Sequence, residues 1–256
     1  MPSIRSVANA GHAVGWTMFM CSVAVPLYGI TRHRPTFQKM QRFWARSLAS
    51  AWGMQVRAHG VDQLDPGGKF VFMANHLSHV DIVALFVALP MNVGFLAKKE
   101  LRKVPFLAQA MVAGGHVFID RKARTHAANT LTAAARTVAA GAPLVIFPEG
   151  TRGSGDVVQP FKRGGLNLAL QAGVHVVPVG LRGTRAIMGR EDLVIRPGNV
   201  EVHVGAPIEP RGFDTSVQLM EHVRGRIGEL AAMPLATSGA SAPSRTIDSG
   251  LRSGAD

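Results

Sequence analysis

The stretch FVFMANHLSHVDIVALFV, residues 70–87, decides the fold of this chain. Its first five residues are apolar and predict a buried strand, and a second apolar run over residues 82–87 predicts a helix. His76 then lies on the turn between them, and Asp81 lies in the first or second helical turn. A strand followed at once by a helix indicates an α/β sheet, in which ligand clefts usually lie at the strand ends.

His76 and Asp81 carry the chemistry that this turn suggests. On a continuous helix, a separation of five residues would place the two side chains about 140° apart, so they meet only if the chain turns between them. A histidine with a carboxylate on its far nitrogen is the arrangement of a general base with a fixed tautomer. The alternative is a polar turn in which His76 is a surface imidazole and Asp81 a helix cap. The motif alone leaves both interpretations open.

Composition narrows the class of protein. A chain of 256 residues can bury one principal core. Apolar residues make up 47% and charged residues 17%, which is too mixed for a polytopic membrane protein. The 28 Lys and Arg against 16 Asp and Glu give a net charge of +12, which favours anionic lipid surfaces, phosphorylated substrates or nucleic acid as partners. Aromatic residues make up only 6%, which argues against single-stranded nucleic acid.

The single cysteine, Cys21, excludes an intramolecular disulfide and a cysteine-based metal cluster. It lies within residues 13–30, an uncharged run whose eighteen residues are at the lower limit for a spanning helix, which needs roughly 20. A signal peptide, a spanning or re-entrant anchor and an interfacial helix are the three interpretations. The signal peptide ranks last, because no small-x-small cleavage site precedes a polar start. Only Arg5 precedes the run, whereas five Lys and Arg residues follow it within residues 32–46, which predicts that the next domain is cytoplasmic.

Residues 36–54 predict a basic amphipathic helix, which either lies on a membrane surface or packs on the protein's own core. We therefore interpret residues 1–53 as an N-terminal membrane-associating helical segment. The rest alternates short apolar runs with helical patterns, as in an α/β domain over residues 54–233. The predicted strands are 54–58, 69–74, 93–97, 116–119, 143–147, 176–181 and 200–204, and the predicted helices are 81–88, 105–113, 125–140, 164–172 and 214–232. The composition of residues 234–256 predicts a disordered tail.

Two further strand ends deliver polar residues. A predicted strand ends at Asp120 and Arg121, and an arginine held there suits bidentate recognition of a phosphate. The alternative is a solvated charge cluster before a helix. Another strand ends in the loop 147–152, which contains both a carboxylate and a guanidinium, and whose glycine lets backbone amides approach a ligand. The loop lacks the spacing of a Walker motif.

Taken together, these motifs resemble those of the glycerolipid acyltransferases, most closely the 1-acyl-glycerol-3-phosphate acyltransferases. The resemblance covers residues 55–205, most of the chain. The blocks that carry it are, in order, Asn75-His76 to Asp81 with its His-x-x-x-x-Asp spacing, Lys98-Lys99-Glu100-Leu101 with Pro105, Phe118-Ile119-Asp120-Arg121, Phe147-Pro148-Glu149-Gly150-Thr151-Arg152, and Val177-Pro178-Val179. The spacing of the first block is a weak signal alone, whereas these blocks together, in the right order, are a strong one.

The resemblance implies roles for individual residues. His76 would be the general base, and Asp81 would orient it. The substrate-binding residues, which would hold the phosphorylated acceptor, would be Lys98, Arg121, Glu149, Gly150, Thr151 and Arg152. His79 departs from the pattern by adding a second imidazole, and we expect it to face away from Asp81.

The resemblance also implies a fold and a reaction. The fold would be a single α/β acyltransferase domain, with a mixed central sheet flanked by helices. The enzyme would move an acyl group from acyl-CoA or acyl carrier protein, as a co-substrate, to lysophosphatidic acid at a membrane lipid surface, giving phosphatidic acid. The scheme needs no cofactor, metal or nucleic acid. Two alternatives remain: acylation of another lyso-lipid, such as a lysophospholipid or a lyso-ornithine lipid, and a non-catalytic basic membrane-surface protein.

Overall fold

The computed structural model describes residues 4–120, 124–190 and 194–236. Within them, seven strands form one sheet in the order β1-β7-β6-β2-β5-β3-β4. The strands are β1 Met54–His59, β2 Phe70–Ala74, β3 Gly94–Lys98, β4 Val117–Ile119, β5 Leu144–Ile146, β6 His175–Arg182 and β7 Gly198–Val204. Every neighbouring pair is parallel except β6 and β7, which are antiparallel, so the sheet is mixed as predicted.

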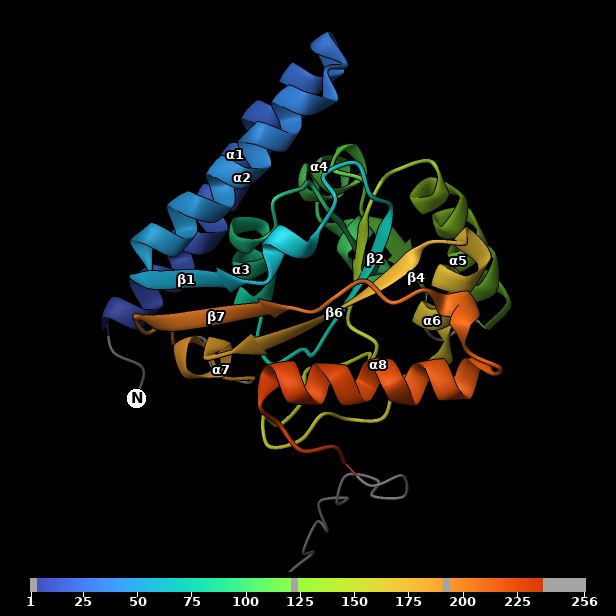
Figure 1. Ribbon diagram of the computed structural model, residues 1–256. Helices are drawn as coiled ribbons and strands as arrows, with labels where there is room; N and C mark the ends of the chain where they lie inside the picture. Colours follow the sequence, from blue (N-terminus) through green and yellow to red (C-terminus); the bar gives the residue numbers. More distant parts are fainter. Residues whose placement is uncertain (1–3, 121–123, 191–193, 237–256) are drawn as a thin grey trace, which may run out of the picture.

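Helices cover both faces of the sheet (Figure 1). The α-helices are α1 Ile4–Thr31, α2 Arg34–Ala51, α3 Val80–Ala88, α4 Leu107–Ala113, α5 Arg124–Ala139, α6 Arg163–Ala172, α7 Thr184–Ile187 and α8 Ser216–Ala231. Three 3-10 turns, η1 Val61–Gln63, η2 Lys99–Lys103 and η3 Pro210–Gly212, join them. The seven predicted strands and five predicted helices of the α/β domain are confirmed to within about two residues at each end. The four-residue helix α7 was not predicted, because so short an element has no apolar period of its own.

Strand β2 lies at the centre of the core. Its five residues are all buried, and the pleat points them alternately to the two faces of the sheet. Phe70, Phe72 and Ala74 belong to the apolar cluster beneath α2, α3 and α7, whereas Val71 and Met73 belong to the cluster beneath α5, α6 and α8. Burial of a phenylalanine side chain such as Phe72 contributes about 2–3 kcal/mol. The unbroken apolar run in β2 therefore follows from burial on both faces.

Helices α1 and α2 form a long antiparallel hairpin at one side of the sheet, and its far end projects beyond the body (Figure 1). Two indole-to-hydroxyl bonds join them, from Trp16 to Ser47 at 2.7 Å and from Trp44 to Thr17 at 3.0 Å. Helix α2 buries Leu48 and its neighbours against α3, so one face of it packs on the protein's own core. Residues 8–31 of α1 are long and apolar enough to cross a membrane, and 17% of the most apolar window is buried.

The predicted tail begins with three residues that the structure describes. The backbone N–H of Val158 donates to the carbonyl of Pro234, and the N–H of Ala236 donates to the carbonyl of Val158. These contacts order residues 234–236 against the body of the domain. Residues 237–256 of the predicted tail lie outside the described residues.

Candidate active site

The residues predicted to carry function follow the ends of four neighbouring parallel strands. β2, β5, β3 and β4 are adjacent in the sheet and run in the same direction, so their carboxyl ends share one edge. His76 follows β2, Lys98 ends β3, and Glu149 follows β5. Arg121, which follows β4, lies outside the described residues. The expectation that separate strand ends converge on one cleft is confirmed for the loops after β2 and β5, and Lys98 at the end of β3 lines the same cavity.

His76 and Asp81 lie in contact. The His76 Nδ1 atom is 2.7 Å from Asp81 Oδ2. The chain makes the turn that this contact requires, because α3 begins only at Val80 and places Asp81 in its first turn. Asp81 is fully buried, whereas 17% of the His76 side chain is exposed. The paired arrangement, and not the surface imidazole, is therefore present.

One oxygen of Asp81 accepts three hydrogen bonds. Besides the imidazole, Oδ2 accepts from the backbone N–H groups of Leu77 and Ser78 at 2.8 and 2.9 Å. The second oxygen, Oδ1, has no hydrogen-bond partner among the described residues. A carboxylate that accepts from Nδ1 places the proton there and leaves Nε2 unprotonated. The pair can therefore take up a proton at His76 Nε2.

Glu149 holds the backbone of His76. Its Oε1 accepts from the His76 N–H at 2.9 Å, and its Oε2 accepts from the Gln159 N–H at 3.1 Å. In return, the Gly153 N–H donates to the His76 carbonyl at 2.7 Å. Burial raises the pKa of Glu149, while the two N–H groups oppose that shift. The loop after β5 is thus fastened to the loop after β2 through a buried carboxyl group.

Gly150 permits the sharp turn of this second loop. Its φ is +74°, in the region that side chains disfavour, and a Cβ there would lie 2.8 Å from the side chain of Lys162. Phe147, at the start of the loop, stacks on His76 with ring centroids 4.0 Å apart and planes 14° apart. The contact of Phe147 with His76 was not predicted, because no local sequence pattern shows which ring a phenylalanine will contact.

Basic and polar side chains surround the exposed side of His76. Lys98, Thr151 and Arg152 line the same cavity as His76, and Arg152 also donates to the carbonyl of Arg190. His79 lines this cavity too, although no hydrogen bond joins it to Asp81 within the part of the chain that the structure describes. Burial and the charge of Arg152 lower the pKa of His79. His79 therefore faces the cavity, whereas its position in the sequence predicted only that it faces away from Asp81.

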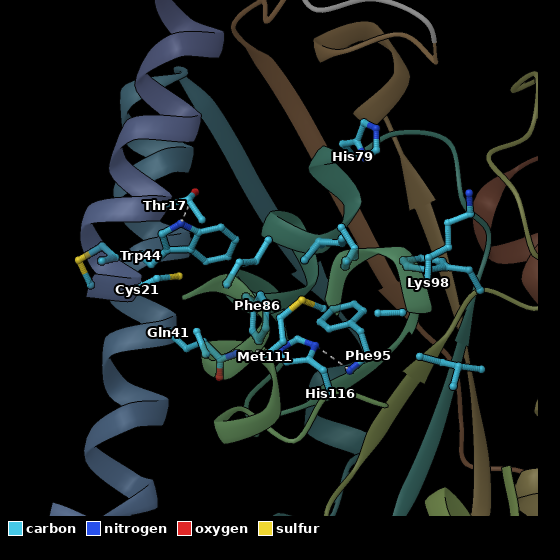
Figure 2. A pocket seen from close by; sticks show the side chains of 18 of the residues that line it. Thr17, Cys21, Gln41, Trp44, His79, Phe86, Phe95, Lys98, Met111 and His116 are labelled. Atoms are coloured by element: carbon cyan, nitrogen blue, oxygen red, sulfur yellow. Dashed lines mark hydrogen bonds between the residues drawn. The ribbon is translucent and has the colours of Figure 1, made fainter. Parts of the chain in front are cut away.

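The cavity has a volume of about 570 Å³ and is mostly apolar beyond this basic mouth. Figure 2 shows Lys98 and His79 on one side and Thr17, Cys21 and Trp44 on the other. The apolar part is enclosed by α1, α2, α3, β3 and α4, so the helical hairpin forms one of its walls. Its size is that of a ligand pocket, which typically measures 300–1,000 Å³.

His116 lies in the apolar part of this cavity (Figure 2). Its Nδ1 accepts from the Phe95 N–H at 3.2 Å, and its Nε2 lies 2.9 Å from the side-chain amide nitrogen of Gln41. Burial lowers the pKa of His116 to about 4. Contacts with α2 and β3, which lie far from it in sequence, create this site, so the sequence offered no signal for it.

Comparisons with known proteins agree on one family. The sequence model of the Acyltransferase family matches residues 55–182. The 1-acyl-sn-glycerol-3-phosphate acyltransferase alpha of Homo sapiens is 28% identical over 87% of this chain and 80% of its own length. The 1-acyl-sn-glycerol-3-phosphate acyltransferase of Saccharomyces cerevisiae is 32% identical over 70% of this chain and 57% of its own. The crystal structure of the 1-acyl-sn-glycerophosphate acyltransferase PlsC from Thermotoga maritima superposes with a TM-score of 0.79 at 24% identity, covering 91% of this chain and 97% of that one, so the fold is shared.

Proposed function

The chain belongs to the Acyltransferase family, and we propose that it acylates the free hydroxyl of 1-acyl-sn-glycerol 3-phosphate with an acyl thioester to give phosphatidic acid. The names of its relatives support this acceptor. The observation that carries the proposal is the His76–Asp81 pair at the basic mouth of a mostly apolar cavity. A general base, a phosphate-binding group and an apolar chamber are what an anionic lipid with a reacting hydroxyl requires.

The proposed reaction is a direct transfer. The acceptor oxygen attacks the thioester carbonyl carbon while His76 Nε2 takes its proton, and Asp81 stabilises the imidazolium that forms. The tetrahedral intermediate then breaks its carbon–sulfur bond, and the thiolate of CoA or acyl carrier protein leaves and takes up the proton. No covalent acyl-enzyme is required, and Ser78, whose hydroxyl donates to the carbonyl of Met188, is oriented away from such a role.

Lys98 and Arg152 hold the acceptor phosphate, and Arg121 and Thr151 assist them. Fixing the phosphate sets the distance from the hydroxyl to His76, which supplies the orientation that catalysis needs. We assign Glu149 a positioning role, since both of its oxygens already accept from backbone N–H groups. The apolar part of the cavity accommodates an acyl chain.

We propose that α1 lies in the membrane surface with the catalytic domain on the cytoplasmic side. One flank of α1 packs against α2 and α4, whereas a spanning helix requires hydrocarbon or another membrane segment all around it. Its other flank exposes apolar side chains such as Val14, Phe19 and Ile30. Arg32, Arg34 and Lys39 follow the uncharged run of residues 13–30, and this favours the cytoplasmic side for the domain after it.

The placement of α1 is tested by extracting membranes at high salt, because screening weakens surface charge contacts. Release of the chain by salt, or by salt with alkaline wash, fits a surface helix. Retention of the chain through both treatments, with α1 protected from protease at both ends, contradicts it and indicates a spanning helix.

The activity is tested with purified protein, labelled acyl-CoA or acyl carrier protein, and a panel of lyso-lipid acceptors. We expect 1-acyl-sn-glycerol 3-phosphate to be the best acceptor and His76→Ala to lose about two to four decades of turnover. His175→Ala, which removes an exposed histidine paired with Glu209, is the matched control and keeps full activity. Preference for a lysophospholipid or lyso-ornithine lipid would overturn the acceptor, and the absence of any product would indicate a binding protein.

A further inference from the structure

Three potential metal ligands lie together on the outer part of the sheet. His59 ends the edge strand β1, and Glu201 and His203 lie in its neighbour β7. His59 and His203 are register partners, and Glu201 is two residues before His203, so all three side chains lie on one face of the two strands. The alternate β7 residues, such as Val200 and Val202, are buried in the core. The three residues therefore face outward, away from the core that the valines enter.

The three side chains already converge. The rings of His59 and His203 stack with centroids 4.5 Å apart and planes 11° apart. His203 Nε2 lies 3.1 Å from Glu201 Oε2. One potential ligand atom from each residue lies within 4.8 Å of the other two. Ligand atoms about 2.0–2.1 Å from a tetrahedral zinc ion lie roughly 3.3 Å apart, so His203 and Glu201 are at that separation. Binding requires a rotation of the exposed His59 side chain to close the remaining gap.

The electrostatic surroundings also matter for a cation. Glu201 supplies an acidic side chain, and its Oε2 lies at hydrogen-bond distance from His203 Nε2. Arg57 and Arg182 are the register partners of Glu201 on the two neighbouring strands. Arg182 is directed toward α8, where its Nε atom donates to the Leu230 carbonyl at 2.8 Å. The site thus combines two imidazoles with one carboxylate, next to the positive charge of neighbouring arginines.

We propose that His59, Glu201 and His203 bind a divalent transition-metal ion, with Zn²⁺ as the ion that this ligand set suits best. Imidazole and carboxylate ligands are common for zinc, and a water molecule would complete the tetrahedron. Calcium and magnesium prefer oxygen ligands and do not compete. None of the three residues lines the cavity of His76, so the site is separate from the proposed acyl transfer.

The ion would fasten the edge strand to the sheet. Among the described strands, β1 pairs only with β7, and it directly follows α2 of the helical hairpin. A metal bridge between His59 and the two β7 ligands crosses this single ladder. Because the ion binds the folded chain and not an unfolded one, its binding stabilises the fold in proportion to the metal concentration.

The test is zinc binding to the purified full chain by titration calorimetry after chelation and desalting. We expect the wild type to bind one more equivalent of zinc than His59→Gln or His203→Gln, and Glu201→Gln to bind that equivalent about tenfold more weakly or worse. His175→Gln is the matched control, since His175 forms a pair with Glu209 at 3.4 Å that no third ligand joins within the described residues. His175→Gln should still bind the additional equivalent of zinc.

Cobalt provides a second readout, because Co²⁺ in a tetrahedral site absorbs strongly in the visible. We expect that band in the wild type and in His175→Gln, its loss on addition of zinc, and its absence from His59→Gln. Equal zinc stoichiometry and affinity in the wild type and in His59→Gln would overturn the proposal. His59 is exposed at a strand end, so this variant folds even if His203→Gln does not.

Discussion

The two histidines of the cavity have the same side chain but opposite surroundings. His76 and His116 lie at the two ends of one row of stacked rings, with Phe147 and Phe95 between them. Centroid separations along the row are 4.0, 6.2 and 5.7 Å. His76 is partly exposed at the basic mouth and has a carboxylate partner. His116 is enclosed in the apolar part, and uncharged groups engage both of its nitrogens.

These surroundings determine whether a histidine can serve in proton transfer. At His76, the Asp81 carboxylate lies at hydrogen-bond distance, where it stabilises a positive ring, and Nε2 remains available to a substrate. At His116, no carboxylate hydrogen-bonds to the ring among the described residues, and burial holds its pKa near 4, so the ring stays neutral at pH 7. The first site is suited to catalysis, whereas the second fastens α2 to β3.

Removal of the carboxylate next to His76 should have the largest effect on the comparison. Asp81→Ala loses the acceptor of all three hydrogen bonds, and we expect acyl transfer to fall by about two to four decades. Asp81→Asn can place its amide oxygen where Oδ2 lies and its NH₂ where the unpartnered Oδ1 lies. The tautomer is then kept and only the charge is lost, so we expect a smaller loss, of about one to two decades.

Turnover at saturating substrate measures both variants, and circular dichroism verifies that they fold. Asp156→Asn, which changes an exposed carboxylate 3.9 Å from Arg185, is the control and keeps full activity. If the Asn and Ala variants were equally inactive, the orienting role of the three hydrogen bonds would be wrong.

Glu149→Gln tests whether the position of the His76 backbone matters for its activity. Glutamine offers one oxygen, so one of the two N–H groups would face an NH₂ in a buried place. We expect about 1–3 kcal/mol of lost stability and a roughly tenfold fall in turnover, because the His76 backbone shifts.

Urea unfolding and the transfer assay measure these two effects. Glu229→Gln, at an exposed carboxylate paired with Arg226, should change stability by less than about 0.5 kcal/mol. A Glu149→Gln variant that kept full stability but bound the acceptor poorly would instead support direct contact of Glu149 with the substrate.

The sequence predicted the fold because its strands and helices follow from local patterns. Apolar runs mark the strands, and the turn at residues 75–80 permitted the contact of His76 with Asp81, which the family resemblance then favoured over a simple polar turn. The roles of Phe147, Glu149 and His116 depend on partners that other strands supply. The proposed zinc ligands His59 and Glu201 are likewise 142 positions apart and meet only through strand pairing. A pattern along the chain does not contain that information.

His116 provides the smallest and most selective prediction, which concerns pH. The ordinary pKa of histidine is near 6.5, and burial lowers that of His116 to about 4. Between these values the unfolded chain takes up a proton that the folded chain does not, so stability falls as the pH falls through this window. From pH 7.5 to pH 5, this single group should cost about 2 kcal/mol.

His116→Gln removes this contribution, even though the substitution itself lowers stability at both pH values. The quantity to compare is the change in the free energy of unfolding between pH 7.5 and pH 5, from urea titrations in one detergent. We expect that change to be about 2 kcal/mol smaller in His116→Gln than in the wild type. His222→Gln, at an exposed histidine that contacts Phe213, should retain the wild-type change. Equal pH dependence in the wild type and His116→Gln would mean that the ring of His116 accepts a proton in the folded chain, and the contrast with His76 would then fail.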